Sequence, residues 1–235
     1  MRKDSRREGF TLIEIMVAVF IFSIIVTTLF SSYNSIFSKA KAINQRIGSY
    51  EMARNCINRM IIDLKSMRLT LLPEYAPPDS GDPPDPCRIV GSSSYAGDKS
   101  FSRLRFASME HLPIDKGFKG GVAEIVYYVC AAGEKGFVMK RADRTYPYDE
   151  PFEEKAGDPV LCENIKSLAI KYYDLDEDEY EFWDSESKDF DYASPRSIGI
   201  ELEIYEGSAD IEDENSTFLL FETGVRPPVY REKKD

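Results

Sequence analysis

Apolar residues run almost without interruption through the first part of the chain and then recur at helical spacing. Residues 10–30 contain one charged side chain, Glu14, and as a helix they would rise roughly 31 Å, close to the thickness of a bilayer's hydrocarbon core. Further on, apolar residues recur every three or four positions as far as Leu64. The pattern predicts one helix over 10–68, with a transmembrane half, 10–30, and an amphipathic half, 31–68.

The periodicity then breaks and returns with a period of two. Residues 69–100 are rich in Pro, Gly, Ser and Asp, which predicts a loop. Short β-branched or aromatic runs follow, bounded by Gly, Pro or Asp, and predict strands at 101–108, 122–131, 136–143, 163–174, 179–185, 197–207 and 216–225. The segment 124–141 is expected to form a hairpin. The fold class is therefore α+β, with a mainly antiparallel β-rich head over 101–235.

Charge places the two ends of this helix in different compartments. Basic residues outnumber acidic ones in the leader, 1–9, so the positive-inside rule keeps this end in the cytoplasm. The head is then expected in the periplasm of a two-membrane bacterium. No small-residue cleavage site follows residue 30, so the apolar segment is expected to be retained. The net charge of −11 argues against binding to nucleic acid.

Glu14 is the unusual residue of the apolar run. A charged side chain at the centre of a membrane helix costs about 2.5–3.5 kcal/mol, so it normally has a partner. Glu14 could lie near the interface and reach water, belong to a proton or ion path, or pair with a cation of another chain. Cleavage between Gly9 and Phe10 would create a cationic α-amine on Phe10, one helical turn from Glu14.

The stretch "REGFTLIEIMVAVFIF" resembles the class III signal of type IV pilins and type II secretion pseudopilins. The matching positions are Gly9, Phe10, Thr11, Leu12 and Glu14. The resemblance implies a pilin-like fold, cleavage after Gly9 by a prepilin peptidase and N-methylation of Phe10. It also implies a single-pass protein of the inner membrane that has a structural rather than an enzymatic role, with Glu14 pairing with the amine of a neighbouring subunit.

The order of segments in the head resembles the J-type minor pseudopilins. The strand "IVYYV", a hairpin return, "IKSLAIKYYD", a Trp-containing segment and "SIGIELEI" carry this resemblance. It implies a role at the tip of a periplasmic pseudopilus, with the I, K and H minor types and the major pseudopilin as partners. A minor type IV pilin of the PilW type is one alternative. A membrane-anchored periplasmic binding module or enzyme is another.

Four cysteines, Cys56, Cys87, Cys130 and Cys162, would face an oxidising compartment. None is spaced as C-x-x-C, so zinc and haem motifs are absent. Four cysteines allow three connectivities. We favour Cys130–Cys162 and Cys56–Cys87 bonds, and the alternative is that one or more remain buried thiols.

No cofactor is expected. The acidic run 174–191 predicts a solvated face or a docking patch for a basic partner, with calcium as the alternative, although the run has no EF-hand spacing. His111 is the only histidine, so a catalytic triad would depend on this one residue, which has no evident acid or nucleophile beside it. Nucleotide-binding glycine motifs are also absent from the sequence.

Overall fold

A computed structural model describes residues 9, 11–79, 81–110, 121–133, 136–145, 152–206 and 216–232. Its one long helix, α1, spans Leu12–Lys65. The chain divides into two compact units, residues 1–46 and 47–235, so the last turns of α1 belong to the same unit as the strands. The helix ends three residues before the expected boundary at 68, because Met67 and Arg68 form a short strand, β1.

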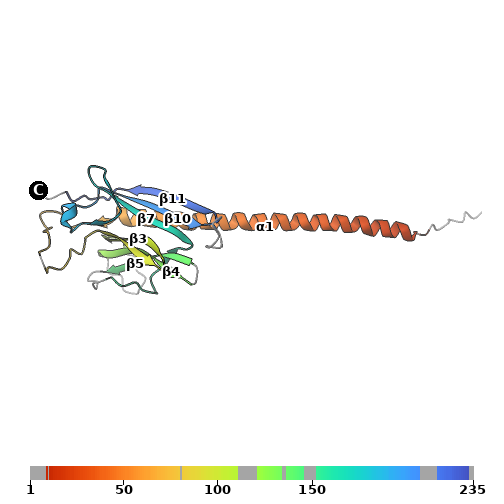
Figure 1. Ribbon diagram of the computed structural model, residues 1–235, viewed down its shortest axis with the longest axis horizontal. Coiled ribbons are helices and arrows are strands. Elements are labelled where there is room, and N and C mark those ends of the chain that lie inside the picture. The colour runs from red at the N-terminus through yellow and green to blue at the C-terminus, as the bar shows by residue number, and fades with distance from the viewer. Residues whose placement is uncertain are drawn as a thin grey trace, which may run out of the picture. The chain divides into compact units, whose positions relative to one another are not determined.

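The second unit contains two antiparallel sheets, whose longer strands are labelled in Figure 1. The larger sheet has the order β6-β5-β4-β3-β2-β9, with β1 paired to β3. Its other strands are β2 Val90–Ala96, β3 Lys99–Ser108, β4 Ala123–Ala132, β5 Gly136–Thr145, β6 Val160–Cys162 and β9 Trp183–Asp184. The smaller sheet has the order β11-β10-β7-β8, formed by β11 Phe218–Val225, β10 Ser197–Tyr205, β7 Ile165–Tyr173 and β8 Glu179–Tyr180. A short 3₁₀ helix, η1, spans Lys188–Phe190. The predicted α+β class with antiparallel sheets is confirmed.

One face of the last turns of α1 packs into the core of this unit. The buried residues recur at helical spacing and are Ala53, Cys56, Ile57, Met60 and Leu64. They join buried residues of both sheets in one hydrophobic cluster. The later part of the predicted apolar stripe, from Ala53 to Leu64, therefore joins the helix to the strands, whereas its earlier members, Ile43, Ile47 and Tyr50, are exposed.

Strand β4 is covered on both faces. Tyr127 and Val129 belong to the main core, whereas Val126 and Tyr128 belong to a second, smaller cluster with Ala142, Cys130 and Phe152. This explains why the sequence of β4 reads as a continuous apolar run rather than as an alternation. The predicted hairpin is present, since β4 and β5 pair from Ala123↔Thr145 to Ala132↔Gly136.

Two predictions from the sequence were wrong. The range 69–100 is not a loop throughout, because it contains β2, which pairs with β3 from Val90↔Arg105 to Ala96↔Lys99. The strand was missed because Gly and Ser are not typical strand residues. Gly91 is required by packing, since a Cβ at this position would lie 2.1 Å from the hydroxyl oxygen of Tyr172. The range 179–185 is not one strand either, because β8 and β9 belong to different sheets.

Candidate assembly site

The N-terminal motif begins with a capped helix. The backbone N–H of Glu14 donates to the carbonyl of Thr11 at 3.1 Å and to its Oγ1 at 3.4 Å. A threonine here satisfies N–H groups that have no partner within the first turn of a helix. Glu14 is exposed in this first turn, and Gly9 is exposed just before it. Phe10 lies outside the described residues.

The surface of α1 from Leu12 to Phe30 consists mainly of exposed apolar side chains. By length and composition this helix is suited to cross a membrane, and it is the one such helix among the residues that the structure describes. The polar hydroxyls in the run bond within the helix itself: Ser23 Oγ donates to the carbonyl of Val19, and Thr27 Oγ1 to that of Ser23, both at 2.8 Å. Inside a bilayer there is no water to bind, so polar groups must find their hydrogen-bond partners within the protein. Glu14 is thus the exposed ionisable side chain of an otherwise apolar surface.

At its other end, α1 is fixed to the larger sheet by a buried ionic cluster. Nε of Arg141 on β5 lies 2.7 Å from Oδ2 of Asp63, and both side chains are fully buried. Arg59 reaches the other oxygen of Asp63 at 2.6 Å, and Asp143 pairs with Arg141 at 2.5 Å. The hydroxyl of Tyr127 on β4 also donates to Asp63. Three segments therefore meet at one carboxylate.

The surroundings shift the pKa values of two members of this cluster, Arg141 and Tyr127. Burial by itself would lower the pKa of Arg141, but its hydrogen bonds and ion pairs with Asp63 and Asp143 raise the pKa overall. Burial and the neighbouring Asp63 carboxylate raise the pKa of Tyr127 well above its usual range, so its hydroxyl keeps the proton that it donates. Because the buried charges of Asp63 and Arg141 need each other as partners, the cluster favours one position of α1 on the larger sheet.

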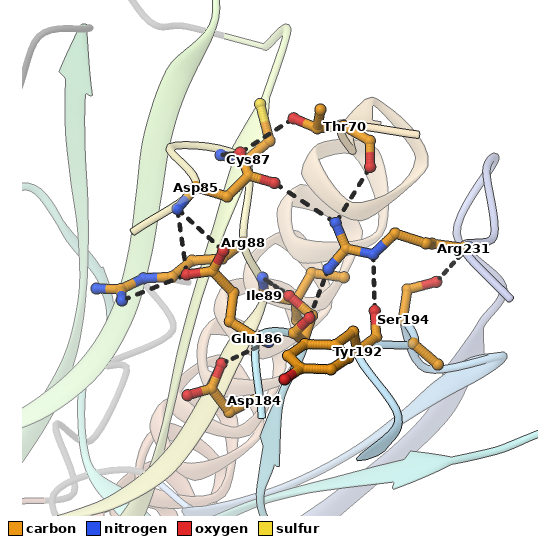
Figure 2. A network of polar contacts seen from close by, with 12 residues as sticks. Thr70, Asp85, Cys87, Arg88, Ile89, Asp184, Glu186, Tyr192, Ser194 and Arg231 are labelled. Atoms are coloured by element: carbon orange, nitrogen blue, oxygen red, sulfur yellow. Dashed lines mark hydrogen bonds and ion pairs between the residues drawn. The ribbon is translucent and has the colours of Figure 1, made fainter. Parts of the chain in front are cut away.

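A second polar network holds the C-terminal segment, and Arg231 lies at its centre (Figure 2). The guanidinium donates to the carbonyls of Thr70, Ser185 and Tyr192 at 3.1, 2.5 and 2.8 Å. It also lies 3.4 Å from Oδ2 of Asp85 and 3.5 Å from the ring centroid of Tyr75. This one side chain therefore joins the segment after α1, the loop before β2 and the chain end.

Sequence reasoning did not single out the centres of these networks. Asp63 does carry a signal, since it lies three residues after Met60 and seven after Cys56 on the otherwise apolar face of the helix. An acid on that face requires a buried cation. Arg231 carries no comparable signal, because it follows the last strand in a region without periodicity.

The structure does not bring together the expected cysteine pairs. Cys130 contributes to the small cluster on one face of β4, whereas Cys162 lies in the main core on the other. Cys87 lies beside Asp85, with Thr70 and Arg68 among its neighbours. All four cysteines are free in this structure, and Cys56 shares the main core with Cys162 rather than with Cys87. The predicted Cys130–Cys162 and Cys56–Cys87 bonds are corrected because strand alternation and helix register send these side chains to different places.

The acidic run 174–191 does not form a metal site in the part of the chain that is described, where no group of three or more His, Cys, Asp or Glu side chains is suited to hold an ion. Its carboxylates have other roles: Asp174 Oδ1 accepts from the N–H groups of Asp176 and Asp178 at 2.9 and 3.0 Å, and Glu179 pairs with Lys171 at 3.3 Å. His111 lies outside the described residues.

Comparisons with known proteins agree with the N-terminal motif. Residues 4–30 match the family model described as the prokaryotic N-terminal methylation motif. No curated protein sequence matches the chain. Among solved structures, a type IV-like pilin from Thermus thermophilus aligns with 76% of this chain and 96% of its own, at 7% identity and a TM-score of 0.41. The motif that matches therefore contains the expected processing junction, Gly9-Phe10, and Glu14.

Proposed function

We propose that this chain is a minor pseudopilin of a type II protein secretion system, of the J type, that helps to initiate the pseudopilus. The observation that carries the proposal is the match of residues 4–30 to the methylation motif, in a chain whose motif helix continues into a folded head. A pseudopilin needs both parts: a helix that assembles in the membrane, and a head that is presented outside it.

The first step is processing. A prepilin peptidase cuts between Gly9 and Phe10 and methylates the new N-terminus, while the leader stays in the cytoplasm. The helix that begins at Leu12 remains in the inner membrane, and the head lies in the periplasm. The exposed apolar side chains of residues 12–30 then face lipid or the helices of neighbouring subunits.

Glu14 drives the second step. The free α-amine is cationic below a pKa of about 7.7–8.0. In the bilayer, the carboxylate of Glu14 on one subunit neutralises the amine of Phe10 on its neighbour, and this pairing sets the axial stagger between their helices. An unpaired charge in lipid is costly, so the pair forms only when two subunits are in the correct register. Repetition of such a contact by a non-closing rotation produces an open filament.

The size of the head supports a position at the tip. It contains two sheets, and a head of this size is not accommodated at every repeat of a thin fibre. The partners are the I, K and H minor types and the major pseudopilin. The tip complex starts the fibre that moves folded proteins through the outer membrane.

Gene deletion separates this function from the second candidate, a minor type IV pilin of the PilW type, which the same motif favours equally. Deletion is expected to leave exported enzymes in the periplasm and to leave twitching and surface pili unchanged. The full chain restores secretion, and a chain without residues 10–30 does not. Normal secretion with loss of pili would favour the minor pilin. Restoration by the chain without 10–30 would favour a periplasmic binding module.

A further inference from the structure

Two of the four cysteines lie together in the core, on segments far apart in the sequence. Cys56 is 2% exposed on the buried face of α1, and Cys162, the last residue of β6, is fully buried. Both belong to the main hydrophobic cluster. Strand β6 lies at the edge of the sheet order, where its one paired neighbour is β5.

Met139 neighbours both cysteines. Sγ of Cys56 lies 3.5 Å from Sδ of Met139. Met139 is directly opposite Cys162 in the β5–β6 ladder, so these two side chains point to the same face of the sheet, toward the helix. The neighbouring thiol of Cys162, followed by burial, raises the pKa of the Cys56 thiol.

A neighbouring contact repeats this approach one helical turn earlier. The backbone N–H of Glu163 donates to Sδ of Met52 at 3.4 Å. Met52 and Cys56 are four residues apart on α1, and Glu163 follows Cys162 in the chain. The helix therefore runs alongside the end of β6 over two contacts, rather than touching it at one point.

The other two cysteines have no such neighbour. Cys130 pairs in register with Val138, and its side chain points to the face of β4 opposite that of Val129 and Met139. Cys87 lies in the loop before β2, where its backbone N–H donates to Asp85 at 2.9 Å. Neither thiol lies beside Cys56 or Cys162, so only one pair is positioned to react.

We propose that Cys56 and Cys162 form an intramolecular disulfide bond that joins α1 covalently to β6. The inference rests on the proposed function in one respect, since that function places the head in an oxidising compartment. The oxidant is a disulfide, either of a thiol oxidoreductase or of glutathione. One thiolate attacks it and releases the first thiol; the second cysteine attacks the mixed disulfide and releases the second. Two electrons and two protons leave the cysteine pair.

The bond would matter during assembly. The membrane half of α1 is held by neighbouring helices in the proposed pseudopilus, so force on the fibre reaches the head through the end of the same helix. A covalent link between Cys56 and β6 transmits that force to the edge strand of the larger sheet without relying on packing alone. Because both thiols are buried in the folded head, the bond forms before the helix docks fully.

The test is a peptide map of the full chain, isolated from cell envelopes in acid, unfolded and alkylated without reductant. Trypsin places the four cysteines on separate peptides: 55–59, 69–88, 120–135 and 156–166. We expect peptides 55–59 and 156–166 to be joined, and alkylation of Cys87 and Cys130 only. Reductant should raise the number of alkylated cysteines from two to four. Alkylated Cys56 and Cys162, or any other pairing, would overturn the inference.

Protease treatment of spheroplasts separates this inference from the proposed function. A head that is digested from outside but contains free Cys56 rejects the disulfide and leaves the function intact. A head that is protected rejects the function. In that case the disulfide is decided by refolding the denatured full chain with oxidised glutathione and mapping the same peptides.

Matched variants show whether the pairing depends on the other cysteines. The double variant Cys87→Ser/Cys130→Ser retains both proposed partners and is expected to give the same joined peptides. Cys56→Ser is expected to give three alkylated cysteines with or without reductant. If Cys162 forms a disulfide with Cys130 in the Cys56→Ser variant, the fold does not restrict Cys162 to Cys56, and the inference fails.

Discussion

Nε of Arg141 donates a hydrogen bond of 2.7 Å to Oδ2 of Asp63, and water reaches neither side chain. The pair joins β5 to the last turns of α1, where the helix enters the folded head. Because Tyr127 and Arg59 bind the same carboxylate, Asp63 fixes both the position and the rotation of the helix on the sheet.

Asp63→Ala should destabilise the head by about 3–5 kcal/mol, because Arg141 stays charged and buried and keeps only Asp143 of its two carboxylate partners. The measurement is urea unfolding of the full chain in detergent. Trp183, the only tryptophan, is 2% exposed and stacks on Phe190, so its fluorescence reports unfolding of the head. Glu51→Ala is the control, since Glu51 is exposed on the same helix. A loss below about 1 kcal/mol for Asp63→Ala would show that the pair is dispensable.

The double variant Asp63→Leu/Arg141→Met should be less destabilised than Asp63→Ala. It removes the two charges of this pair together and restores similar volume with apolar atoms, so the remaining cost is that Asp143 loses Arg141 as a partner. The same fluorescence measurement checks it. If the double variant is the less stable of the two, the charges contribute net stability rather than specificity.

The helix and most strands were predictable because their patterns are local. The stripe that contains Ile57, Met60 and Leu64 follows a period of 3.6, and β10 alternates buried with partly exposed residues from Ile198 onward. Strand β2 was not predictable, because Gly91 and three serines lack β propensity and the strand depends on its pairing with β3.

The cysteine contacts were not predictable for a different reason. The alternation of side chains along a strand predicts that Cys130 and Val129 point to opposite faces of β4. It does not predict which of the two faces the helix covers. That choice depends on tertiary packing of α1, and it brings Cys56 to Cys162. The N-terminal motif, in contrast, could be recognised from the sequence alone. The proposed partners of Gly9, Phe10 and Glu14 are other molecules, so their proposed roles do not depend on how this chain packs.

Gly9→Ala should block removal of the leader. Among the described residues outside its immediate chain neighbours, no atom lies within 4 Å of a Cβ built at Gly9, so alanine meets no steric obstacle there. A loss of processing would therefore reflect recognition by the peptidase. The check is the mass of the N-terminal peptide from envelope fractions, with Ser5→Ala as a control within the leader. A normally shortened Gly9→Ala protein would refute the cleavage junction.

Glu14→Gln should insert and be processed as in the wild type but assemble poorly. The amide keeps the size of the side chain and removes its charge, so the α-amine of the neighbouring subunit loses its counter-ion in lipid. Cross-linking of envelope fractions to the major pseudopilin measures assembly, and we expect roughly a tenfold loss, which corresponds to about 1.4 kcal/mol. Thr11→Ser is the matched control, since a serine retains the helix cap. Equal cross-linking of Glu14→Gln and wild type would reject the charge pairing.

Arg231→Ala should release the chain end and destabilise the head by about 3 kcal/mol, since three carbonyls and Asp85 lose a buried donor. Unfolding followed by Trp183 fluorescence measures the loss. Arg226→Ala, at an exposed position five residues earlier, should change stability by less than about 0.5 kcal/mol. Equal stability of the two variants would mean that the network in Figure 2 does not stabilise the head.

Glu186 should give the head a pH dependence of known sign. Burial raises the pKa of this carboxyl above 4.5, although its hydrogen bond from the backbone N–H of Asp85 opposes the shift. Asp85 and Asp184 also raise the pKa, and Arg88 lowers it. The folded state therefore binds the proton more readily than the unfolded state. Its contribution to stability is complete below pH 4.5 and is lost as the pH rises through the higher folded-state pKa.

Glu186→Gln isolates this contribution, because the amide does not titrate. We expect the free energy of unfolding of the wild type, minus that of Glu186→Gln, to fall as the pH rises from 4.5 and then to level off. Urea unfolding at a series of pH values measures the difference, and it cancels the titration of carboxylates that both proteins share. The same substitution at Glu222, an exposed position on β11, is the comparison variant. A difference that rises with pH for Glu186→Gln would mean that the hydrogen bond from Asp85 outweighs burial.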